Sequence, residues 1–265
     1  QYSVKYRDHP FLRLMKDLEK AVENRKKERV ESGSSSSGDF IDIFLDSEVD
    51  EGDIQSVDNT NLVFDEVVSL CIVMLLAGFE TTANSLSYLT HFLANDQRVQ
   101  DKLYEEIDVI CPNENIEYEE LNDLTYMECV IKESLRFYPL ASVVVNRECI
   151  RDTTIGGIQV KKGDLIQTDT WSMHMDKEIW GDDAEEFRPE RWLEKPDRPR
   201  IDFQSFGEGP RICLGMRLAY MEEKIALVYL LKNFRIEKNK DTNPLRLMGS
   251  MIVTPERVMV TLKRR

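Results

Sequence analysis

The stretch that most restricts the fold of this chain is "FGEGPRICLG", Phe206 to Gly215, where one cysteine lies among three glycines and a proline. Gly207 and Gly209 can adopt backbone angles that other residues avoid, and Pro210 stiffens the turn. The stretch therefore predicts a loop of fixed shape rather than a flexible linker.

The residues around Cys213 distinguish two interpretations of that loop. A helix is predicted over 214–233, so the thiol would lie near the positive end of a helix dipole, which favours the thiolate. A lone cysteine in a turn is ordinarily a buried structural residue. Here Phe206 can shield the sulfur, Arg211 offers a positive charge to a carboxylate, and Gly215 leaves room for a flat ligand. A shielded thiolate of this kind is a good axial ligand for haem iron.

Composition and charge exclude several other functions. Charged residues make up 32% of the 265 residues and hydrophobic residues 42%, as in a soluble globular protein. The net charge of −14 argues against nucleic acid as the main partner. None of the five cysteines forms a CxxC or CxH pair, which argues against structural zinc.

The periodicity of apolar residues predicts a mainly α protein with a small antiparallel β-sheet. The apolar run from Val67 to Phe79 is too short to span a bilayer and predicts a buried helix. Residues 176–205 are predicted to be irregular. Helices are predicted over 11–31, 40–47, 63–94, 97–110, 117–121, 125–137 and 214–233, and strands within 143–170 and near 234–237 and 257–263.

A second motif, "AGFETT", lies inside the long apolar helix. Ala77 and Gly78 would leave a groove on one face. The Thr81 hydroxyl, one turn beyond Ala77, can compete for the Ala77 carbonyl and bend the helix. Glu80 beside Thr81 could then hold water and a proton path. A core helix with a polar kink is the alternative interpretation.

Two further motifs carry charge. In "KESLRFYP", Glu133 and Arg136 are three residues apart on one predicted helix, a spacing that permits an ion pair. "FRPERW" places Arg191 downstream of them. An exposed pair would contribute less than ~1 kcal/mol. His174 is interpreted as a hydrogen-bonded structural residue rather than a ligand.

Together these motifs resemble the cytochrome P450 superfamily, and most closely its animal microsomal drug- and steroid-oxidising members. The cysteine loop matches the pattern Phe-x-x-Gly-x-Arg-x-Cys-x-Gly at each fixed position, and the other motifs follow in the order that the family requires. Intact members are about twice as long, and this chain begins without methionine. The resemblance implies the C-terminal part of the P450 fold, with residues 1–265 as a partial catalytic domain that lacks the N-terminal half and the membrane anchor.

The resemblance also implies roles for individual residues. Cys213 would be the axial ligand of a haem b iron, and Glu80 and Thr81 would supply protons during oxygen activation. Glu133, Arg136 and Arg191 would form a structural network that supports the cysteine loop. The remaining haem contacts would be Ala77, Phe206, Gly207, Arg211 and Gly215.

The implied function is a monooxygenase that inserts one atom of dioxygen into a small lipophilic substrate. Electrons would come from an NADPH-dependent flavoprotein reductase, with cytochrome b5 as an optional second donor, at the cytoplasmic face of the endoplasmic reticulum membrane. The alternative is a truncated fragment without haem or activity, which would act as a remnant or interaction fragment.

Two surfaces are expected from the same resemblance. Arg217, Lys224 and Lys232 would form a docking face for the electron donor or, equally, a solvated helix face. Residues 140–144 and 248–251 would form walls of the substrate pocket, and both stretches are apolar.

Overall fold

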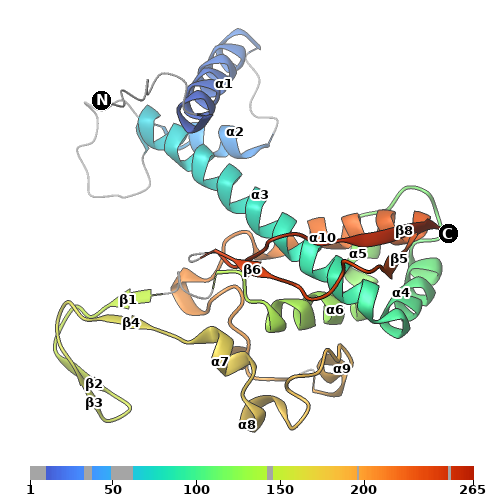
Figure 1. The fold of residues 1–265 in the computed structure, drawn as a ribbon. Helices are drawn as coiled ribbons and strands as arrows, with labels where there is room; N and C mark the ends of the chain where they lie inside the picture. The colour runs from blue at the N-terminus through green and yellow to red at the C-terminus, as the bar shows by residue number, and fades with distance from the viewer. Residues whose placement is uncertain (1–9, 33–37, 49–61, 142–145, 196, 250–251) are drawn as a thin grey trace, which may run out of the picture. The chain divides into compact units, whose positions relative to one another are not determined.

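The computed structural model describes residues 10–32, 38–48, 62–141, 146–195, 197–249 and 252–265 (Figure 1). Within these ranges the protein is mainly helical and its strands pair in small antiparallel sheets, as the sequence predicts. The chain divides into two compact units, Gln1–Phe79 and Glu80–Arg265, and the boundary falls inside helix α3, Phe64–Asn95.

The first unit contains α1 (Pro10–Ser32), α2 (Phe40–Leu45) and the first half of α3. Its core is a small apolar cluster, and the buried carboxylate of Asp42 accepts a hydrogen bond from Arg25 at 2.8 Å. The core consists of Val22, Leu45, Val67, Val68, Cys71 and Ile72.

The apolar run of α3 is buried only in part. Val67 and Ile72 are buried, but the prediction of a wholly buried helix is wrong for four large apolar side chains, which are exposed: Val73, Leu75, Leu76 and Phe79. The thirteen-residue run was predicted to be too short to span a bilayer, but the helix that contains it has 32 residues and, among the described residues, is the one helix long and apolar enough to cross a membrane. Core helices of soluble proteins also pass this test.

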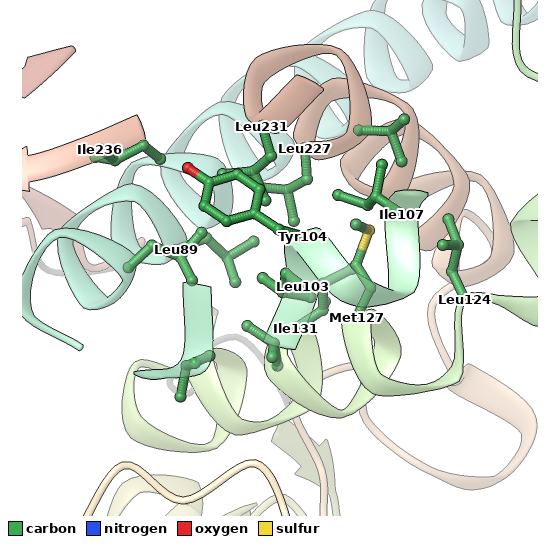
Figure 2. Packing of buried hydrophobic residues seen from close by; sticks show 14 of the residues in the cluster. Leu89, Leu103, Tyr104, Ile107, Leu124, Met127, Ile131, Leu227, Leu231 and Ile236 are labelled. Carbon is green, nitrogen blue, oxygen red and sulfur yellow. The ribbon is translucent and has the colours of Figure 1, made fainter. Parts of the chain in front are cut away.

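The second unit is built on a packed group of long helices (Figure 2). These are the second half of α3, α4 (Gln97–Ile110), α6 (Thr125–Phe137) and α10 (Met216–Asn233). Buried side chains from all four meet in one cluster, which includes Leu89, Leu103, Tyr104, Ile107, Met127, Ile131, Leu227 and Leu231.

Side-chain caps define where two of these helices begin. The Asp96 carboxylate accepts the amide of Val99 at 3.1 Å and caps α4. Glu106, on α4, accepts the amides of Tyr126 and Met127 at 2.6 and 2.8 Å and so caps α6 from outside that helix. One carboxylate of α4 thus caps α6 and links the two helices.

The described strands form four separate two-stranded antiparallel sheets. They pair as β1 (Asn146–Glu148) with β4 (Leu165–Gln167), β2 (Thr153–Ile155) with β3 (Ile158–Val160), β5 (Phe234–Lys238) with β8 (Val260–Arg264), and β6 (Leu247–Met248) with β7 (Thr254–Pro255).

The short elements differ most from the prediction. The helix expected over 117–121 is α5 (Glu120–Asp123). The stretch expected to be irregular, 176–205, contains short helical turns. These turns are α8 (Lys177–Trp180), α9 (Arg191–Glu194) and η3 (Arg200–Asp202), and α7 (Thr170–His174) lies just before them.

Candidate functional site: a braced cysteine loop

The cysteine loop has a fixed backbone path. Gly207 and Gly209 have φ angles of +73° and +77°, which side-chain-bearing residues rarely adopt. The 3-10 turn η4 (Gly209–Arg211) follows, and the Cys213 amide then donates to the Phe206 carbonyl at 2.8 Å. The loop is thus closed on itself, and the Cys213 thiol is exposed two residues before the N-cap of α10.

The residues next to the Cys213 thiol in the chain are exposed to solvent. Leu214 is 86% exposed, and Ile212 is also exposed. Gly215 has a φ of −84°, and a Cβ added there would meet no atom of the described chain within 4 Å. Its missing side chain therefore leaves free space beside the sulfur rather than relieving strain.

The other predicted loop residues have different positions. The Phe206 ring is half-buried and packs on the Tyr220 ring of α10, with centroids 5.3 Å apart. It links the loop to the core cluster. Gly207 is buried, whereas Arg211 is exposed at the end of η4.

A buried charge network lies on α6 and the segment that follows it. The Glu133 carboxylate accepts hydrogen bonds from Arg136 at 2.9 and 3.0 Å and from Arg191 at 2.9 Å. It also accepts the Trp192 indole N–H and the Arg188 amide, each at 3.0 Å. Glu133, Arg136 and Arg191 are essentially inaccessible to water. The structure thus brings these three predicted residues together in the interior, not on the surface.

Arg191 has additional partners that the sequence did not indicate. It donates to the carbonyls of Trp180, Asp183 and Glu186 at 3.1, 2.8 and 3.2 Å, and to the Asp183 carboxylate at 3.1 Å. Backbone carbonyls are present at each position whatever the side chain, so no sequence pattern could have identified them. The guanidinium therefore holds the whole turn between α8 and α9.

His174 connects this network to the cysteine loop. Arg136 donates to the His174 carbonyl at 2.6 Å. The imidazole Nε2 accepts the Gln204 amide at 3.0 Å, so Nδ1 carries the proton and donates to the Arg136 carbonyl at 3.2 Å. As predicted, His174 is a hydrogen-bonded structural residue.

The next bonds reach the loop itself. The Gln204 carbonyl accepts the amide of Gly207 at 3.0 Å, and the Ser205 hydroxyl donates to the Leu135 carbonyl of α6 at 2.9 Å. A continuous series of hydrogen bonds thus runs from Glu133 to the backbone that carries Cys213. Gln204 and Ser205 were not predicted, because nothing distinguishes them from other polar loop residues.

The protonation of His174 makes the network sensitive to acid. Burial lowers the pKa of His174 to about 4, and the nearby Arg136 charge acts in the same direction. In the unfolded chain the pKa is about 6.5. The folded state therefore binds fewer protons between these values, and stability falls as the pH drops from 6.5 toward 4.

We expect the free energy of unfolding to decrease by about 3 kcal/mol over that pH range through His174 alone. Urea unfolding of wild type and His174→Gln at several pH values measures this decrease. The variant should be less stable at neutral pH, and its free energy of unfolding should change less as the pH falls. His91→Gln should also reduce the pH dependence, since burial lowers the pKa of His91 too, and the effects of the two substitutions should add. Equal pH slopes for wild type and His174→Gln would contradict the assignment.

The second predicted motif lies in the middle of α3. Glu80 is exposed, Thr81 is half-buried and Ala77 is exposed. The helix runs unbroken through this motif. In the second unit, the Thr82 hydroxyl donates to the Glu222 carboxylate of α10 at 3.2 Å. The helix that carries Glu80 and Thr81 is therefore bonded to the helix that follows Cys213.

The three cations of α10 have different environments. Arg217 is exposed and lines a groove of about 840 Å³ together with Lys132, Trp192, Arg198 and Tyr220. Lys224 is buried and donates to the Leu121 carbonyl and the Glu128 carboxylate at 2.8 and 3.0 Å. Both interpretations of Lys224, a docking residue and a solvated one, are wrong. Lys232 is half-buried and donates to the Asn113 carbonyl.

The expected pocket walls are described only in part. Residues 142–144 and 250–251 lie outside the described residues. Leu140 is buried and its carbonyl accepts the Val253 amide at 2.8 Å, whereas Met248 is exposed.

Fold and site together define a mainly helical protein in which a buried Glu–Arg–Arg network supports an exposed cysteine on a rigid loop. A family model described as "Cytochrome P450" matches residues 7–262. The chain belongs to the cytochrome P450 family.

Several curated relatives come from Caenorhabditis elegans. The chain is 43% identical to "Putative cytochrome P450 CYP13A5" and 42% identical to "Putative cytochrome P450 CYP13A4", in each case over 97% of this chain and 53% of the relative. It is 44% identical to "Putative cytochrome P450 CYP13A3", over 95% of this chain and 52% of the relative. The chain thus spans about half the length of these relatives.

Family membership implies a haem, and the loop fits one. A soft sulfur ligand is exposed beside apolar Leu214 and beside the space left by Gly215, where a flat apolar group can approach. In the described part of the chain, no group of three or more His, Cys, Asp or Glu side chains could hold a metal ion.

Proposed function

We propose that the protein is a haem-thiolate monooxygenase that transfers one oxygen atom from dioxygen to a small lipophilic substrate. The observation that carries this proposal is the exposed Cys213 thiol at the end of a loop held by the buried Glu133 network. We further propose that both compact units belong to one catalytic domain. The truncated remnant without activity is not favoured, since each residue of the family motifs is present.

Cys213 would hold haem b iron through its thiolate. The thiol lies two residues before the N-cap of α10. Gly215 would give the ring room, and exposed Arg211 would pair with a propionate. When bound, the haem supplies the oxygen chemistry, with the thiolate donating electron density that favours O–O cleavage.

Glu80 and Thr81 would move the protons. Glu80 is exposed and can exchange a proton with water, whereas half-buried Thr81 can pass it on through its hydroxyl. Ala77 lies one turn earlier on α3, and its small side chain would leave room for the haem beside the helix.

Electrons would come from an NADPH-dependent flavoprotein reductase, with cytochrome b5 as an optional second donor. Arg217 and Lys132, at the groove beside the cysteine loop, would attract an acidic partner surface. The endoplasmic reticulum membrane, at its cytoplasmic face, is the proposed location.

The spectrum of the reduced full-length protein with carbon monoxide tests this function. A thiolate-type band, together with NADPH-dependent oxidation of a lipophilic substrate by the reconstituted protein and reductase, is the expected result. A reduced protein that binds haem without that band would overturn the proposal.

The role of Thr81 has its own test. We expect Thr81→Ala to retain haem but to show a several-fold lower ratio of product formed to NADPH consumed. Without proton delivery through the Thr81 hydroxyl, more of the reduced oxygen would be released as hydrogen peroxide. Ser87→Ala is a matched control on the same helix, since the Ser87 hydroxyl donates only to its own helix, at the Ala83 carbonyl, 2.8 Å away. Unchanged coupling in Thr81→Ala would rule out the role.

A further inference from the structure

The two segments expected to line the substrate pocket meet at Val253, in the second unit. Val253 lies in the turn between β6 and β7, and its amide donates at 2.8 Å to the carbonyl of Leu140, in the segment after α6. Its carbonyl accepts the hydroxyl of Tyr88, on α3, at 3.0 Å. Both backbone groups of Val253 are thus bonded to other parts of the chain.

The turn that carries Val253 has a tight shape of its own. Gly249 has a φ of +94°, and a Cβ added there would overlap the Ile252 carbonyl oxygen. Met248 pairs with Thr254 at the base of the turn. The β6–β7 hairpin therefore keeps its internal shape, and its position relative to the helices depends on its attachments. These include the bonds of Val253 and the packing of Ile252 on the core cluster.

Tyr88 contacts the other segment as well. Its ring stacks on the ring of Tyr138, with centroids 4.4 Å apart and planes inclined by 20°. Tyr138 is the C-cap of α6 and lies two residues before Leu140. Tyr88 is 1% exposed, and burial together with the neighbouring Tyr138 raises the pKa of Tyr88, so its hydroxyl keeps the proton that it donates. A phenylalanine at this position could form the same stack, so the bond to Val253 is what requires a tyrosine.

We propose that Tyr88 is a positioning residue for substrate binding, which holds the β6–β7 hairpin at a fixed distance from the segment that follows α6. Its ring packs at the start of that segment, and its hydroxyl holds the hairpin at Val253. This role rests on the proposed function, in which the two segments are walls of the substrate pocket. Without the hydroxyl bond the hairpin moves more easily, and the pocket becomes less selective for the length of a lipophilic ligand.

Hydrogen exchange of the full-length protein tests the attachment without catalysis. In Tyr88→Phe the Val253 amide should exchange about fivefold faster than in wild type, the factor expected for the loss of one buried hydrogen bond. Tyr104→Phe is the matched control, because the Tyr104 hydroxyl bonds to Gln100 of α4 at 2.7 Å and to the Phe234 carbonyl of β5 at 3.1 Å. Unchanged exchange at Val253 in Tyr88→Phe, or equal acceleration in both variants, overturns the proposal.

Ligand binding provides a measurement that a merely structural role would not change. The probes are N-alkylimidazoles with butyl, octyl and dodecyl chains, whose nitrogen binds haem iron, and the shift of the haem absorption reports their binding to the haem-loaded full-length protein. Tyr88→Phe should bind butylimidazole several-fold more weakly and dodecylimidazole almost as tightly as wild type, because a looser wall fits short chains less well but gives room to long ones. Tyr104→Phe should keep the wild-type ratio of affinities. An unchanged ratio in Tyr88→Phe overturns the role.

Failure of the proposed function itself has a different signature. It would appear as a missing thiolate band in reduced wild type with carbon monoxide. The exchange rate of the Val253 amide would still show whether Tyr88 holds the hairpin, because that measurement needs neither haem nor substrate.

Discussion

Replacement of Cys213 by alanine is expected to abolish the thiolate-type carbon monoxide band and all NADPH-dependent oxidation. No other described cysteine can substitute, because the other four are buried. Since the Cys213 side chain is exposed and its amide bond to Phe206 does not need the sulfur, we expect the free energy of unfolding to change by less than ~0.5 kcal/mol. Spectroscopy and urea unfolding of the same sample separate ligation from folding.

Cys129→Ala provides the matched control. This thiol lines the groove beside the loop, but it is buried on α6, and burial raises its pKa to about 11. It is therefore a thiol, not a thiolate, and its removal should leave the band intact. A band that persists in Cys213→Ala would show that another ligand holds the iron.

Replacement of Arg191 by alanine is expected to reduce the free energy of unfolding by ~3–5 kcal/mol. The side chain is 2% exposed and bonds to the Glu133 carboxylate and to several backbone carbonyls. Its loss leaves these acceptors buried without a donor, which is costlier than the loss of an exposed ion pair. Urea unfolding of wild type and variant gives the difference.

Arg188→Ala controls for the loss of an arginine from the same segment. The Arg188 side chain is 31% exposed and pairs with Asp183 and Glu194, so its truncation should cost less than ~1 kcal/mol. Arg191→Lys retains the positive charge but not the planar guanidinium with its several N–H donors. Its free energy of unfolding should therefore be closer to that of Arg191→Ala than to that of wild type. A small effect of Arg191→Ala, comparable with that of Arg188→Ala, would contradict a buried network.

Long amphipathic elements could be predicted closely from the sequence. The helix predicted over 97–110 is α4, which begins after the Asp96 cap, and the helix predicted over 125–137 is α6, which ends before Pro139. Periodicity and caps determine such helices locally. The pairing of Glu133 with Arg136 follows from the same local rule.

Burial of charged residues could not be predicted in this way. Glu223 and Lys224 lie in a segment that looks like a solvated helix face, yet both are buried, because α10 is packed against several helices at once. The links through Gln204 and Ser205 depend on backbone groups brought together only by the fold. A local sequence pattern does not predict such partners.

The series of hydrogen bonds from Glu133 to the cysteine loop also bears on protein engineering. The loop controls its own shape through Gly207 and Gly209, but its attachment depends on His174 and on α6, which come much earlier in the chain. A ten-residue transplant of "FGEGPRICLG" into an unrelated scaffold would carry the sulfur and the turns without the support that fixes their position. The portable unit is therefore the loop together with α6 and the segment from α7 to α9.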